Sequence, residues 1–187
     1  MSEDLIVRHC APTLAGLKTG NMFSCSFENP REMCEAACEL NHRLLSKGVC
    51  TVPLKYKDGK ALLYIYRPKK LEADMQCCQA CEILEERGYC CGHINMTIAQ
   101  LRKRLQNSDS FPHEIGLFLG YPPRDVKGFL NEKKGKPCDH VCTGYWKVYG
   151  DESDMIEAEK IFDRFRKCIR IYLDQWSKGK TIERLTV

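Results

Sequence analysis

The stretch VCTVPLKYKDGKALLYIYR, residues 49–67, contains two strand-like runs joined by a tight turn. Its first and last eight residues are rich in aliphatic and aromatic side chains, and Asp58-Gly59 between them is typical of a two-residue hairpin turn. Pro53 has no backbone N–H to donate, so it places the first strand at a sheet edge or at a bulge. The sequence therefore predicts an antiparallel β-hairpin in the first half of the chain.

The segments before the hairpin predict a strand and a helix. Residues 21–27, NMFSCSF, are rich in aromatic and small side chains and indicate a strand. The following helix has Asn29 as its N-cap, Pro30 in its first position and Glu32 three residues after the cap, and it ends at Gly48. These start and stop signals make it the best-defined helix of the N-terminal half.

The rest of the chain predicts mainly helices. One helix runs from Pro68 to Gly88, and from residue 93 the pattern changes to helices in succession. We expect the basic loop 131–143 to be mobile. The expected elements of the second half are helices at 94–106, 111–120 and 122–134, a strand at 144–150 and a long helix at 154–176.

These elements predict an α+β fold class, with a small mixed or antiparallel sheet of about four strands covered by helices and a helical insertion in the second half. A chain of 187 residues is long enough to bury about 70% of the surface of its unfolded state. We therefore expect residues 1–187 to form a single domain. Within it, residues 1–92 supply the strand, helix and hairpin half, residues 93–136 the helical segment, and residues 137–187 the last strand and the long helix.

Composition and charge exclude several classes of protein. The chain is 43% hydrophobic and 29% charged with a net charge of +4, values that are ordinary for a globular protein and do not demand a nucleic-acid partner. The N-terminus carries two acids and no apolar signal segment, and no run of about 18 apolar residues occurs. We therefore expect a cytoplasmic protein without membrane contact. Its 13 cysteines should then be free thiols, metal ligands or reactive groups and not a disulfide framework.

Several blocks of the sequence carry a resemblance to a known family. They are HCAPTLAGLKTGNMF, YRPKKL, FPHEIGLFLGYPPRDVKGFL, and GYWKVYGD followed by AEKIF. In these blocks the chain resembles the uncharacterised, clostridial-type bacterial family DUF3793, one of the domains of unknown function. The resemblance covers nearly the whole chain and implies a cytosolic bacterial protein of unassigned activity, so it transfers no catalytic residue.

Cys10 is the first candidate for chemistry. Pro12 is typical of the first turn of a helix, and a thiol at a helix N-terminus is stabilised as the reactive thiolate. A cysteine nucleophile needs a base, and His113 is the candidate, with Glu114 able to orient another group. The alternative is that CAPTLAGLK forms a short helix that packs over the sheet, with Leu14 as an anchor.

The motifs CCQAC and CCGH offer a metal site. Cys78 and Cys81 have the spacing of a metal knuckle, and Cys90, Cys91 and His93 follow shortly after them. Thiolate and imidazole ligands together suit zinc or iron. Because the first pair falls in the middle of the expected helix, packed or exposed thiols are the alternative.

Two further cysteine motifs have structural interpretations. Cys34 and Cys38 are expected to extend the apolar stripe of the helix that ends at Gly48, because a buried free cysteine behaves as a small hydrophobic side chain. The stripe consists of Met33, Ala37, Leu40 and Leu44.

The motif CDHVC contains Cys138, His140 and Cys142. On an extended backbone all three side chains point to one side, where they suit a soft metal ion. An exposed loop with unconstrained side chains is the alternative.

Residues 115–130 suggest a different class of function, a helix-turn-helix. In that arrangement Arg124 and Lys127 face the major groove of DNA. Asp125 opposes this interpretation because it puts a negative charge at the same helix end, and Gly128 costs the helix about 1 kcal/mol. Two helices packed through a tight turn are common scaffolding, so nucleic acid is not the expected partner.

The segment GYWKVYGD suggests a surface for planar molecules. On a strand, Tyr145, Lys147 and Tyr149 share one side, and Trp146 and Val148 share the other. Two aromatic rings beside a lysine suit stacking on a planar ligand or a base. The alternative is a strand with one face in the core and the other half-covered by a helix.

These candidates favour a small-molecule- or cofactor-handling protein that depends on a thiol, with its site near Cys10, His113 and Glu114. The alternative is a regulatory or interaction module that binds zinc or iron through its cysteine motifs, and a helix-turn-helix-like nucleic-acid binder ranks third. The expected partner is accordingly a small molecule or another protein. No local signature of a catalytic family surrounds Cys10, so the sequence does not assign an enzymatic reaction.

Overall fold

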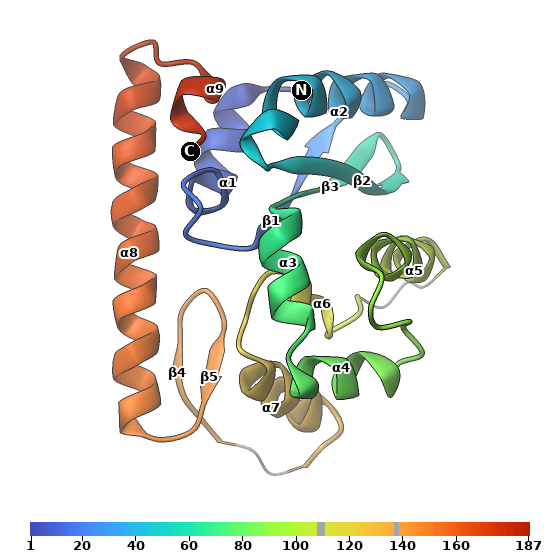
Figure 1. Ribbon diagram of the computed structural model, residues 1–187, viewed down its shortest axis with the longest axis vertical. Helices are drawn as coiled ribbons and strands as arrows, with labels where there is room; N and C mark the ends of the chain where they lie inside the picture. The colour runs from blue at the N-terminus through green and yellow to red at the C-terminus, as the bar shows by residue number, and fades with distance from the viewer. Residues whose placement is uncertain (108–110, 137–138) are drawn as a thin grey trace.

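The structure is a computed structural model that describes residues 1–107, 111–136 and 139–187. It confirms the α+β fold class, with a three-stranded sheet, a helix α1 that lies between this sheet and the long helix α8, and a group of shorter helices below the sheet in the view of Figure 1. In chain order the elements are α1 (Glu3–Leu14), β1 (Gly20–Ser26), α2 (Pro30–Leu44), η1 (Leu45–Lys47), β2 (Cys50–Lys57), β3 (Lys60–Tyr66), α3 (Pro68–Met75), α4 (Cys78–Glu85), α5 (Ile94–Asn107), α6 (Ile115–Phe118), α7 (Pro123–Lys133), β4 (His140–Thr143), β5 (Lys147–Tyr149), α8 (Glu152–Ser177) and α9 (Ile182–Leu185).

The central sheet is antiparallel in the order β1-β3-β2, so the stretch 49–67 supplies both its middle strand and one edge. The turn between β2 and β3 has a positive φ at Asp58 (51°) and at Gly59 (75°), as a type I′ hairpin turn requires. The register shifts between Pro53 and Lys55. The predicted hairpin is therefore confirmed, and its proline lies on an edge strand and at a bulge.

Alternation along β3 divides the core into two clusters on opposite faces of the sheet. Leu63 and Ile65 pack with side chains of α1 and α2, whereas Tyr64 and Tyr66 pack with side chains of helices α3 to α7. The fully buried Tyr64 also donates a hydrogen bond of 2.5 Å to the carbonyl of Phe118. The middle strand thus separates an N-terminal helical layer from the helical segment of the second half.

Helix α1 begins at Glu3 and contains Pro12 in its last turn. The expectation that a helix starts near this proline is therefore wrong. A proline inside a helix removes one backbone hydrogen bond. Burial of Ile6, Cys10 and Leu14 against the sheet offsets that loss, because tertiary packing supplies most of a helix's stability.

Helix α2 confirms the predicted cap, since the side chain of Asn29 accepts the backbone N–H of Glu32 at 2.9 Å. The prediction that Cys34 and Cys38 are buried is wrong, because both are exposed. Each follows a buried residue by one position, which turns its side chain about 100° around the helix toward solvent. The buried stripe itself is as expected, Met33, Ala37, Leu40 and Leu44.

The single helix predicted between Pro68 and Gly88 is divided into α3 and α4. Cys77 adopts an extended conformation as the N-cap of α4 and interrupts the helical backbone. The break lets Met75 of α3 and Leu84 of α4 enter the same core cluster. The thiol of Cys81 donates to the carbonyl of Met75 at 3.0 Å, which satisfies an acceptor at the end of α3.

The last two strands, β4 and β5, form a hairpin of their own and do not extend the central sheet. Residues 140–143, predicted as part of a mobile loop, are the strand β4. The strand predicted at 144–150 is shortened to three residues, because the backbone N–H of Gly144 donates to the carbonyl of Trp146 at 3.0 Å in the turn. The hairpin packs against α7 and α8.

Helix α8 runs along one side of the molecule (Figure 1). It begins at a capping box in which Asp151 and Asp154 each accept a backbone N–H of the other. Its first half covers the β4–β5 hairpin, and further along it packs against α1. The buried residues of this helix lie on one face at helical spacing and are Ala158, Phe162, Phe165 and Cys168. Among the described helices, none has both the length and the apolar character needed to cross a membrane.

Candidate functional site

Cys10 is fully buried in the C-terminal half of α1 and not at its N-terminus. The helix dipole at this end disfavours a thiolate. Burial raises the pKa of the Cys10 thiol far above its ordinary value, and the nearby charge of Lys18 opposes that shift only in part. The thiol is therefore protonated at neutral pH and packs as a small apolar side chain.

His113 and Glu114 lie apart from Cys10, on the other face of the central sheet. Cys10 belongs to the cluster with α1 and α2, whereas Glu114 accepts a hydrogen bond of 3.0 Å from Tyr89, which lies in the opposite cluster. The carboxylate of Glu114 also pairs with Arg104 at 3.2 Å. The structure therefore brings His113 and Glu114 next to a basic group and does not bring either of them to the thiol.

The predicted metal ligands are only partly gathered. The Cys91 thiol donates to the carbonyl of Cys81 at 3.6 Å, while Cys78 and Cys90 are exposed. Burial, together with a hydrogen bond to the Cys81 thiol, raises the pKa of Cys91 to about 11. Within the part of the chain that the structure describes, no group of three or more metal-ligating side chains converges. The zinc or iron site stays a prediction that rests on the spacing of its cysteines.

The CDHVC motif is described in part, since Cys138 lies outside the described residues. The ring of His140 packs against Tyr149 with centroids 6.1 Å apart. Cys142 is half-buried beside the hairpin's small core. Each of the twelve described cysteines is a free thiol, as the expected absence of a disulfide framework requires.

The segment interpreted as a helix-turn-helix has a different architecture. Its first helix, α6, is a single turn over Ile115–Phe118. Arg124, which would face DNA only in a helix-turn-helix, pairs with Asp154 of α8 at 2.8 Å. These contacts hold the start of α7 to the start of α8, so this arginine has a structural role.

An aromatic pocket of about 270 Å³ lies between α6, α7 and β5. The ring of Tyr121 lies 5.1 Å from that of Trp146, and the ring of His113 meets Phe129 edge-on at 5.2 Å. Trp146 is supported from behind by Phe162 of α8 at 4.6 Å. The aromatic and polar side chains that line this pocket are Phe111, His113, Tyr121, Asp125, Phe129, Trp146 and Lys147.

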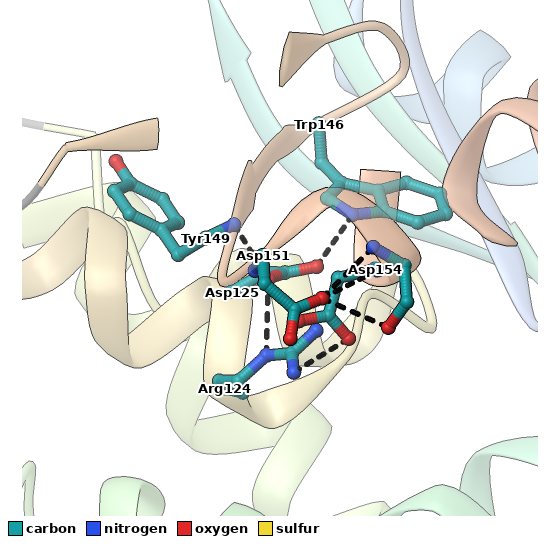
Figure 2. Close-up of polar contacts among 7 residues, drawn as sticks. Arg124, Asp125, Trp146, Tyr149, Asp151 and Asp154 are labelled. Carbon is teal, nitrogen blue, oxygen red and sulfur yellow. Dashed lines mark hydrogen bonds and ion pairs between the residues drawn. The ribbon is translucent and has the colours of Figure 1, made fainter. Parts of the chain in front are cut away.

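A buried carboxylate fixes the tryptophan wall of the pocket (Figure 2). Asp125, in the first turn of α7, accepts the indole N–H of Trp146 at 2.8 Å and the backbone N–H of Tyr149 at 2.9 Å. Arg124 lies 3.7 Å from the same carboxylate. These contacts hold the β4–β5 hairpin against α7, so the position of Trp146 is set before any ligand arrives.

Lys147 places a positive charge at the pocket. Its ammonium donates to Glu132 at 2.7 Å and lies 5.7 Å from the ring centroid of Phe129. Tyr149 donates to the other oxygen of Glu132 at 2.5 Å. Hydrogen bonds from Lys147 and Tyr149 lower the pKa of Glu132, so the carboxylate stays charged and holds Lys147 in place.

Gly128 has a packing role that the sequence did not reveal. A Cβ atom at this position would lie 2.4 Å from the ring of Tyr149. The glycine therefore lets β5 approach α7 closely. Gly128 counted against a DNA-recognition helix in the sequence. In the structure the same glycine lets the hairpin and α7 form the pocket together.

Sequence reasoning identified His113 and missed most of the pocket around it. Of the side of the GYWKVYGD strand proposed for stacking, Lys147 lines the pocket, Tyr145 is half-buried against Phe165, and Tyr149 is buried against Gly128 of α7. Trp146, which was placed on the other side, lines the pocket instead. The available signal was the aromatic content of FPHEIGLFLGY and GYWKVYGD, but only the fold shows that these segments meet.

Comparison with known proteins gives a family and no activity. The family described as Protein of unknown function (DUF3793) matches the chain over residues 6–186. Neither the curated proteins nor the solved structures contain a significant match. The pocket and its neighbours are therefore the basis for a functional assignment.

Proposed function

Because the chain belongs to the DUF3793 family, whose description assigns no activity, we propose a function from the site itself: the protein binds a small planar compound in the aromatic pocket. The observation that supports this proposal is the enclosure of one cavity by the rings of Tyr121, Phe129 and Trp146. Planar ligands gain from stacking or edge contacts with such rings in addition to the burial of apolar area.

The volume and chemistry of the pocket define the ligand further. A space of about 270 Å³ is near the lower end of small-molecule sites and suits a compound of one or two rings. Asp125 also lines the pocket, but its two oxygens already accept from Trp146 and Tyr149, which leaves His113 and Lys147 as the lining polar side chains that orient the ligand. This proposal keeps the predicted small-molecule function and its residue His113, and it requires no contribution from Cys10.

The proposal is tested with four neutral probes, phenol, indole, quinoline and 1-naphthol. The chain has two tryptophans, Trp146 in the pocket and Trp176 on α8, so their indole N–H signals in a ¹⁵N NMR spectrum give a reporter and an internal control. We expect at least one probe to shift the Trp146 signal saturably and to leave the Trp176 signal in place. Assignment of the two signals follows from a Trp176→Phe variant.

A matched pair of variants separates binding in the pocket from non-specific binding elsewhere on the protein. Phe129→Ala removes one wall and should weaken binding at least fivefold, because a buried aromatic contact contributes on the order of 1 kcal/mol or more. Ile171→Ala truncates a side chain of α8 that is 50% exposed and should change nothing. If no probe moves the Trp146 signal, or if both tryptophans respond alike, the proposed function is wrong.

A further inference from the structure

A basic cavity of about 400 Å³ adjoins the aromatic pocket. The two spaces adjoin at Phe111 and His113, which line both of them. Three cationic side chains line the basic cavity. They are Arg87, which follows α4, and Lys103 and Arg104 of α5.

The described side chains that line this cavity carry a net positive charge. Among its described lining residues, Glu114 is the one carboxylate, and it is 1% exposed. It lies 3.2 Å from Arg104 and 3.6 Å from Arg87, and it also accepts the Tyr89 hydroxyl. Counting only Arg, Lys, Asp and Glu, these described residues carry three positive charges and one negative charge, an excess of two positive charges. An anionic group is therefore the ligand that this cavity favours.

The arginines are held in place before any anion binds. The guanidinium of Arg104 lies 4.8 Å from the ring centroid of Tyr89 and donates to Glu114 and to the carbonyl of Arg87. A guanidinium fixed in this way loses little freedom when it binds a ligand. Its remaining N–H groups, with those of Arg87, present the forked donors that match phosphate oxygens.

We propose that the basic cavity binds the phosphate group of the compound whose ring occupies the aromatic pocket, so that the ligand is a phosphate ester of a planar molecule. This inference rests on the proposed function and adds the chemical class of the ligand to it. A phosphate dianion supplies the two negative charges that the cavity lacks, and its several acceptor oxygens match the donors of Arg87, Arg104 and Lys103. His113 lies where ring and phosphate meet, since it lines both spaces.

The test compares 1-naphthyl phosphate with 1-naphthol on the full-length protein. Both carry the same ring, so the ratio of their dissociation constants, measured from the Trp146 indole signal at low salt, isolates the phosphate. We expect the ester to bind at least tenfold more tightly, and we expect this advantage to fall as salt screens the charges.

A variant on α5 locates the phosphate. Lys103 is exposed and lies outside the Glu114 ion pairs, so Lys103→Gln should leave the fold intact and reduce the advantage of the ester severalfold. Arg102→Gln is the matched control, because Arg102 is also exposed but lines a different cavity with Lys57. Phe129→Ala should weaken both probes equally.

The outcomes separate the two proposals. If naphthol and its ester bind with equal affinity, the phosphate inference is overturned and ring binding stands. If neither compound moves the Trp146 signal, ring binding itself is overturned and the inference falls with it. If the ester is favoured but Arg102→Gln reduces the advantage more than Lys103→Gln, the anion lies elsewhere and the assignment of this cavity is wrong.

Discussion

The indole N–H of Trp146 donates to a carboxylate oxygen of Asp125 across 2.8 Å, and this bond attaches the wall of the aromatic pocket to α7. The second oxygen accepts the backbone N–H of Tyr149, so one buried side chain holds two residues of the hairpin segment. Asp125 is 3% exposed, and water is poorly placed to replace it. The geometry of the pocket therefore depends on an acid that lines it and whose two oxygens are already engaged by the hairpin segment.

Replacing this acid should destabilise the protein. Asp125→Ala leaves two buried donors unsatisfied, and we expect a loss of about 2–4 kcal/mol in the free energy of unfolding, measured by urea denaturation. Asp125→Asn keeps one acceptor and should lose less. Equal stability of the alanine variant and the wild type would show that the hairpin is held by its apolar contacts alone.

Gly128→Ala should also destabilise the protein, although alanine is the better helix former by about 1 kcal/mol. The added Cβ would lie 2.4 Å from the ring of Tyr149, and overpacking of this kind typically costs about 1–3 kcal/mol. Lys127→Ala, at the exposed neighbouring position, is the control and should be nearly neutral. A second variant, Tyr149→Leu, should reduce the penalty of Gly128→Ala if the ring causes it.

Thiol labelling should follow burial and not the predicted chemistry of Cys10. With iodoacetamide at mildly acidic to neutral pH, we expect Cys34 and Cys38 to react early and Cys10 to stay protected until the protein unfolds. Peptide mapping by mass spectrometry gives the order of labelling. Cys10 among the fastest thiols would restore the nucleophile hypothesis and contradict the packing described above.

The stability of the protein should rise with pH over a narrow interval because of Lys18. Burial lowers the pKa of the Lys18 ammonium from 10.5 to about 8, with Cys10 opposing the shift. Between these values the unfolded state binds the extra proton, so unfolding becomes less favourable as pH rises. The slope is at most about 1.4 kcal/mol per pH unit, and below pH 8 the cost of the buried charge is constant.

Cys10 limits that interval from above. Its pKa is raised by burial, so above the ordinary value of 9.0 the unfolded thiol loses its proton while the folded thiol keeps it, and this opposite slope cancels the gain from Lys18. We therefore expect the gain from Lys18 to be visible between about pH 8 and 9. Lys18→Met should remove the gain, and Cys10→Ala should extend it to higher pH. If the free energy of unfolding depends on pH in the same way in the wild type and in Lys18→Met, this account is wrong.

The parts of the fold that local chemistry dictates could be predicted. The hairpin follows from the turn at Asp58-Gly59, and the start of α2 follows from the Asn29 cap, because both signals act over a few residues. The exposure of Cys34 could not be predicted, since cysteine suits either environment. The start of α1 was missed because packing on the sheet overrides the helix-breaking tendency of Pro12.

The site was less predictable because it joins distant segments. His113 stood out as a titratable side chain, but the sequence paired it with Cys10, which lies on the other face of the sheet. Its actual neighbours, Phe129 and Trp146, come from α7 and from the end of the hairpin turn. Nothing in residue spacing fixes that meeting, since it depends on how the hairpin docks on the helix.

The packing of α1 against α8 has a consequence during synthesis. Helix α1 finds this partner only after more than a hundred further residues have been made. At about 5–20 residues per second the wait is on the order of 10 s, during which the α8-facing side of α1 stays uncovered. The α1 segment of the nascent chain should therefore remain protease-sensitive until α8 emerges, whereas the two strands of residues 49–67 are made within a few seconds of each other.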